Sequence, residues 1–196
     1  MKTSSDILAI IGALSLSFTV AAQDQEPLSV LEALPSAEVL GPHWSREISL
    51  LFDPASKPAE IVGVSARLPD SFRKEKRNAV ENPTNRISGW CHAHFIFQAT
   101  NRTHQYEVQV DRYRSKGKVA DDFRQLLALD TKEYQKTKVQ GIGEAAVVYR
   151  NANGMTLWFR RGNFRVWISP LFGSSRWEDD SGLQHLARAF DTRLPP

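Results

Sequence analysis

The sequence predicts an α+β fold in which two main helices pack on one antiparallel sheet of about five to seven strands. Three observations predict this class. Several β-rich segments alternate apolar and polar residues and are joined by short turns. Two segments carry apolar residues at helical spacing. The chain of 196 residues has one cysteine, so a hydrophobic core must hold a single domain together.

The N-terminus predicts export. Lys2 precedes an apolar run at 7–20, and small residues then precede a cleavage point, so residues 1–22 read as a signal peptide. The run is shorter than the roughly 20 residues that span a bilayer, although an uncleaved anchor is the alternative. We expect a tail and short turn at 23–35, then one α+β domain at 36–196. The expected location is periplasmic or extracellular, with no transmembrane segment in the mature form.

The first third of the domain reads as helical turns followed by a strand. Serines at 29 and 36 are suited to cap two short turns, which end at the prolines and glycine of 35–42. Residues 46–52 look extended. The segment 61–68 fits a strand or a helix, and the charged stretch 69–86 predicts a short solvated helix or an exposed loop.

A hairpin and a helix follow. Residues 87–100 are β-rich, "NRTH" at 101–104 predicts a turn, and 105–113 alternates strictly between apolar and polar side chains. The segment 118–136 predicts an amphipathic helix. Its apolar face comprises Val119, Phe123, Leu126, Leu127 and Tyr134.

The C-terminal part predicts a meander and a second main helix. Strands are expected at 144–150, 155–160 and 164–172, because only short turns separate these β-rich runs. The helix is expected at 179–194, where Asp179, Asp180 and Ser181 are suited to its N-terminus. Its apolar stripe comprises Leu183, Leu186, Ala187, Phe190 and Leu194.

Charge and cysteine content exclude some classes of protein. The formal net charge of +3 is far below that of a dedicated nucleic-acid binder, so no nucleic-acid partner is expected. A chain with one cysteine forms no internal disulfide. Cys91 is therefore either buried as a small hydrophobic residue or paired with another molecule.

"GWCHAHFIFQ" at 89–98 is the most distinctive polar pattern. On a strand, Cys91 points away from His92 and His94, because side chains alternate. His-x-His can offer two imidazoles to zinc or copper, but such a site needs a third protein ligand. His104, near the expected turn, is one histidine that could approach them. The alternative is two histidines on a half-covered outer face.

A second pattern lies in the meander. Trp158, Arg160, Arg165 and Trp167 are predicted to share one face of a hairpin whose other face is aliphatic. Tryptophan and arginine are enriched at binding surfaces, so these four residues are a candidate ligand or partner surface. The alternative is a layer covered by a helix, where tryptophan packs under arginine stems.

Two stretches carry a resemblance to a known family. "LPSAEVLGPHW" and "VQGIGEAAVVYRNANGMTLWFRRGNFRVWIS" resemble small exported bacterial proteins of the PsbP-like α/β sandwich superfamily, including actinobacterial lipoproteins and kinase sensor domains. The positions that carry the resemblance are Gly141, Gly143, Glu144, Ala145, Arg161, Gly162 and Asn163. It implies an antiparallel sheet flanked by helices, and proteins that bind ligands or partners without known catalysis. This chain departs from the pattern in lacking a lipidation cysteine and a kinase segment.

The leading functional expectation is an exported, soluble, non-catalytic binding or accessory module, whose protein or small-molecule partner is unknown. No set of catalytic residues stands out, and no cofactor is expected. One alternative is a metal-binding protein or metalloenzyme that uses His92 and His94 to hold zinc or copper. Another is a structural or interaction protein of the cell envelope.

Overall fold

The computed structural model describes residues 28–54, 70–99, 102–129, 133–152, 154–172 and 179–196. In chain order the elements are α1 (Val30–Ala33), α2 (Ala37–Leu40), β1 (Trp44–Phe52), α3 (Asp70–Glu81), β2 (Ile87–Ala99), β3 (Arg102–Tyr113), α4 (Lys116–Ala128), β4 (Gln135–Val139), β5 (Ala145–Asn151), β6 (Gly154–Arg161), β7 (Phe164–Phe172) and α5 (Ser181–Arg193). The predicted signal peptide at 1–22 and the ambiguous segment at 61–68 lie outside the described residues.

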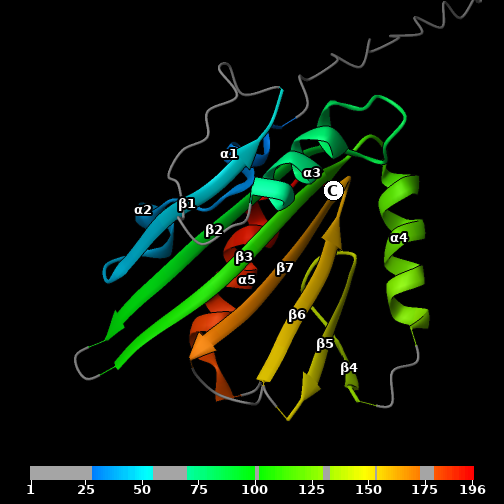
Figure 1. Cartoon of the computed structure of the whole chain (residues 1–196). Coiled ribbons are helices and arrows are strands. Elements are labelled where there is room, and N and C mark those ends of the chain that lie inside the picture. The colour runs from blue at the N-terminus through cyan, green and yellow to red at the C-terminus, as the bar shows by residue number, and fades with distance from the viewer. Residues whose placement is uncertain (1–27, 55–69, 100–101, 130–132, 153, 173–178) are drawn as a thin grey trace, which may run out of the picture.

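The described strands form one seven-stranded antiparallel sheet in the order β1-β2-β3-β7-β6-β5-β4 (Figure 1). The predicted α+β class is thereby confirmed. The hairpin β2–β3 and the meander β5–β6–β7 form as expected, because strands that follow each other closely in the chain pair with each other. The pairing of β3 with β7 joins the first three strands to the last four.

Helices cover both faces of this sheet (Figure 1). We call the face packed against α1, α2 and α5 the inner face, and its core includes Val108 and Val110 of β3, Val166 of β7 and Phe190 of α5. These four side chains are fully buried. The opposite side, which carries α3 and α4, is the outer face. Successive side chains of each strand point alternately to the inner face and to the outer face.

α3 forms where the sequence predicted a short solvated helix or a loop, and most of its side chains are exposed, but one side of it packs on the sheet. Phe72 and Val80 lie on one side of the helix and contact Phe52 and Trp90 of the outer face. The ammonium of Lys76 lies over the rings of Phe72 and Trp90, at 5.2 and 5.5 Å from their centroids. Two large apolar residues are enough to pack this helix on the sheet, because the Lys76 side chain covers more of the Phe72 and Trp90 rings.

α4 ends at Ala128, earlier than the predicted helix, and the last residues of that prediction belong to β4. Ser115 caps the start of α4 by accepting a hydrogen bond from the Lys118 amide. β4 was missed because four of its five side chains are exposed and show no apolar alternation. Its lysines suit an edge strand, where charge discourages pairing with another chain.

The start of α5 is fixed by a buried hydrogen-bond pair. Asp180 caps the helix by accepting from the Leu183 amide at 2.8 Å, and the same oxygen accepts from the Tyr106 hydroxyl at 2.8 Å. Tyr106 is fully buried, so its ring cannot move aside. A Cβ atom at Gly182 would lie 2.3 Å from the Tyr106 hydroxyl oxygen, so this helix position requires glycine.

We predict that Gly182→Ala destabilises the protein by about 1–3 kcal/mol, because the added methyl overpacks a buried site. The matched control is Gly117→Ala, at the same second position of α4. A Cβ there meets only the Ser115 hydroxyl, at 4.0 Å. Alanine should stabilise that helix by about 0.5–1 kcal/mol. Urea unfolding of both variants measures the two effects, and equal effects at the two positions would contradict this account.

Candidate functional site

Alternation along β2 separates the cysteine from the histidines, as the sequence predicts. Cys91 is fully buried in the inner core. Burial raises the pKa of its thiol to about 12, because the thiolate would lie in an apolar environment. His92 and His94 lie on the outer face, beside Trp90. The thiol is thus neither a reactive nucleophile nor a ligand for a site on the outer face.

β3 brings a carboxylate to the two histidines. The register pairs His94 with Glu107 and His92 with Gln109. Residues directly opposite each other on antiparallel strands point to the same face, with Cβ atoms about 4.5–5.5 Å apart. Glu107 therefore lies beside His94 and diagonally across from His92.

The three side chains converge. One donor atom from each of His92, His94 and Glu107 lies within 4.8 Å of the others. Nε2 of His92 lies 2.7 Å from Oε1 of Glu107. Two ligands about 2.1 Å from one tetrahedral ion are about 3.4 Å apart, so small side-chain rotations suffice to surround a metal.

The surroundings orient both imidazoles. The ring of His92 stacks on Trp90 with a centroid separation of 6.1 Å and an interplanar angle of 12°. Nδ1 of His94 lies 3.2 Å from the side-chain amide nitrogen of Gln105. A metal at Nε2 of His94 requires a proton on Nδ1, and the Gln105 amide accepts that proton in its flipped orientation.

His92 is also incompletely hydrogen-bonded. Its side chain is 9% exposed, and Nδ1 has no hydrogen-bond partner among the described residues. An orphaned polar atom in so buried a side chain costs free energy, and such groups concentrate at functional sites.

Glu107 is held in its ionised form. The hydrogen bond from His92 lowers the pKa of Glu107 below its usual value, while partial burial opposes the shift. Its side chain remains 31% exposed, so the cluster opens to solvent on this side. An ionised carboxylate beside two imidazoles is the protonation state that a divalent cation requires.

The location of the turn explains why sequence reasoning missed Glu107. The pairs Ala99 with Arg102 and Gln98 with Thr103 place Thr103 and His104 in β3, whereas the sequence predicted a turn at 101–104. This change in the turn shifts each cross-strand partner by four residues, so His94 lies opposite Glu107 and not opposite Asp111. His104 instead lies opposite Phe97, with a ring separation of 6.2 Å, on the strand face opposite to His94.

The four meander residues lie on the outer face, as predicted. Trp158 pairs with Trp167, and Arg160 pairs with Arg165. The Trp rings are 6.2 Å apart, and Trp158 also packs against the cluster that contains Phe123 of α4. Arg160 forms an ion pair with Glu144. Much of this candidate surface is therefore occupied by contacts within the chain.

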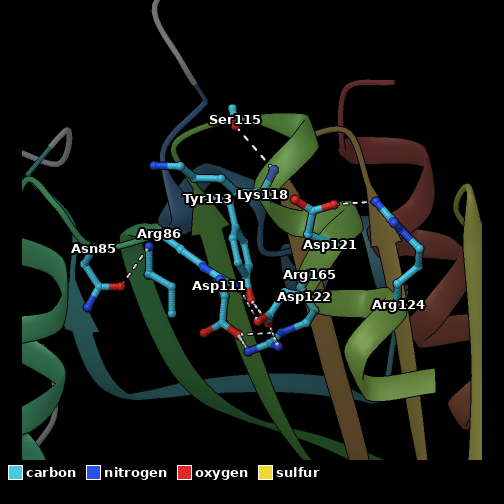
Figure 2. Close-up of polar contacts among 11 residues, drawn as sticks. Asn85, Arg86, Asp111, Tyr113, Ser115, Lys118, Asp121, Asp122, Arg124 and Arg165 are labelled. Atoms are coloured by element: carbon cyan, nitrogen blue, oxygen red, sulfur yellow. Dashed lines mark hydrogen bonds and ion pairs between the residues drawn. The ribbon is translucent and has the colours of Figure 1, made fainter. Parts of the chain in front are cut away.

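Arg165 holds α4 against the sheet (Figure 2). Its guanidinium donates to Asp111 of β3 at 2.6 and 3.0 Å and also to Asp122 of α4. The Tyr113 hydroxyl donates to the same Asp122 carboxylate at 2.5 Å. The guanidinium lies over the rings of Tyr113 and Trp158, at 5.4 and 5.3 Å. Burial works against this charge, but Asp111 and its neighbours raise the pKa of Arg165 overall.

The segment Gly141–Glu144, which precedes β5, has a structural role. Gly143 has φ of 58°, and a Cβ there would lie 2.4 Å from the Arg160 carbonyl oxygen. Its amide donates to Asp191 of α5, which also pairs with Arg161. Glu144 accepts from the Gly162 amide at 3.0 Å. These contacts join the start of β5 and the end of β6 to α5.

No protein-family model, curated protein or solved structure matches this chain. The resemblance to PsbP-like sandwiches therefore stays a prediction. Among the described residues, no helix has both the length and the apolar character that crossing a bilayer requires.

We predict that Arg165→Met destabilises the protein by about 3 kcal/mol or more, because Asp111 is 1% exposed and would lose its cation. Urea unfolding measures the loss. The control is Arg124→Met, which breaks the exposed pair with Asp121. Exposed pairs contribute about 0–1 kcal/mol, so a loss at Arg124 as large as that at Arg165 would contradict the role of Arg165 in holding α4 against the sheet.

The Glu107 carboxyl should titrate below the ordinary glutamate range in the metal-free protein, as followed by its carboxyl ¹³C shift. His92→Phe, which keeps a ring against Trp90, should raise that midpoint, since the hydrogen bond is lost while burial stays. The carboxylate contributes stability above its unfolded pKa of about 4.3, and this is lost as the pH falls through the lowered folded pKa. His43→Asn, at an exposed site, should leave the midpoint unchanged.

Proposed function

We propose that this protein is a binding module that holds one divalent transition-metal ion at His92, His94 and Glu107. The observation that carries the proposal is the convergence of their donor atoms within 4.8 Å on the outer face. Two imidazoles and one carboxylate are a common ligand set for zinc and other divalent first-row ions.

Rigidity of the site supports the proposal. The two histidines are alternate residues of β2, and Glu107 belongs to the neighbouring strand, so the backbone fixes all three Cα positions. A site on paired strands loses little conformational entropy when it binds an ion. An ion held between Nε2 of His92 and Oε1 of Glu107 would replace their short contact.

The protein partner surface at Trp158, Arg160, Arg165 and Trp167 is the less supported candidate. Both arginines already have carboxylate partners within the chain. Export to the periplasm or the extracellular space remains part of the proposal, and its support is the sequence of residues 1–22 alone. A relationship to PsbP-like proteins is also part of the proposal, and its support is the sequence resemblance alone.

The test is metal binding by chain purified without a histidine tag and stripped with a chelator. We expect calorimetry with Zn²⁺ to give a single site, and elemental analysis to give one ion per chain. His94→Ala should weaken binding by at least about a hundredfold, because a three-ligand site loses a direct ligand. His92→Ala should do the same, and thermal unfolding of the metal-free variants checks that they fold.

His43→Asn is the matched control. His43 is exposed and has φ of 75°, a conformation that asparagine tolerates. This variant should bind zinc as the parent does. Zinc bound equally well by the parent and by both site variants, or not bound by the parent, would refute the proposed function.

A further inference from the structure

We infer that Glu47 of β1 is a second carboxylate ligand of this metal site, which makes it a two-histidine, two-carboxylate centre. The inference rests on the proposed function, because it names a further residue of the same site. It also narrows the chemistry of the ion that the site accepts.

The strand register places Glu47 next to His94. β1 pairs with β2 in antiparallel fashion, and Glu47 lies directly opposite His94. Directly opposed residues share a face, and their Cβ atoms are about 4.5–5.5 Å apart. His94 therefore lies between two carboxylates, Glu47 on one neighbouring strand and Glu107 on the other.

The neighbours of Glu47 confirm that its side chain points outward. Arg46 points to the inner side, where its guanidinium donates to the carbonyls of Leu34 and Pro35 at 3.3 Å. Ile48 packs against the inner core. Because side chains alternate along a strand, Glu47 between them lies on the outer face with both histidines.

Glu47 is also available to bind. Its side chain is exposed, and it forms no ion pair with any residue that the structure describes. A glutamate has enough rotatable bonds to carry its carboxylate over the neighbouring histidine. The donor atoms within 4.8 Å of one another belong to His92, His94 and Glu107, so Glu47 reaches the ion by rotation of its side chain.

The resulting ligand set selects the ion by its chemistry. Two imidazoles and two carboxylates suit divalent ions of intermediate hardness, such as Zn²⁺, Co²⁺, Fe²⁺ and Mn²⁺. Copper(I) prefers thiolate and thioether ligands, and Cys91 lies on the opposite face of β2. The two carboxylates balance the charge of a divalent ion, and that neutrality favours its retention.

Glu47→Gln tests the inference, since it keeps the size of the side chain and removes its charge. We expect the affinity for Zn²⁺, measured by competition with a chromophoric chelator, to fall about tenfold or more. The visible absorption spectrum of Co²⁺-loaded protein should change in intensity, because the coordination of the ion changes. Glu38→Gln is the control, since Glu38 is an exposed glutamate of α2.

The possible outcomes distinguish the failure of the Glu47 inference from the failure of the proposed metal-binding function. If Glu47→Gln binds Zn²⁺ and Co²⁺ like the parent while His94→Ala does not, the inference is overturned and the proposed function stands. If the parent binds neither ion, both fail. A drop in affinity shared by Glu47→Gln and Glu38→Gln would reflect the loss of a surface charge and would also overturn the inference.

Discussion

The candidate metal site on the outer face depends on the register of the β2–β3 hairpin. The inner side chains of these strands, such as Ala93, Phe95 and Val108, are fully buried. A slip of one residue would turn this apolar set toward solvent and bring the histidines into the core, at a cost of many kcal/mol. The apolar face therefore fixes, indirectly, which polar residues meet on the other side. The convergence of the two imidazoles and the Glu107 carboxylate is a consequence of packing that occurs on the opposite side of the sheet.

Buried charge pairs complement this packing at one end of β3. Asp111 and Arg112 are consecutive, so they point to opposite faces. Asp111 binds Arg165, which holds α4, while Arg112 donates to Asp53 at 2.8 Å, and Asp53 also accepts from the Val30 amide at the start of α1. Breaking such a pair leaves an uncompensated buried charge. Two adjacent residues thus attach a helix to each side of the sheet.

Periodicity made most of the fold predictable, and its absence explains what was missed. The hairpin, the meander and α5 have clear alternation or a helical stripe, so their positions followed from the sequence. β4 and α3 have too few apolar residues to give such a pattern, and their contacts with β5 and Trp90 fix them instead. Two ligands of the candidate site were visible as His-x-His. The carboxylates at 47 and 107 come from other strands, and only an accurate register identifies them.

The order of the strands has a consequence for how this protein is assembled. All four proposed ligands belong to β1, β2 and β3, and the sheet joins these strands to the rest only where β3 pairs with β7. The β2–β3 pairing is local. The β3–β7 pairing closes a loop of several dozen residues, and we expect it to form more slowly because closing a longer loop costs more chain entropy. A chain leaving the ribosome would present all four residues before β4 to β7 and α5 have emerged. The residues of the candidate site can therefore come together independently of the β3–β7 pairing.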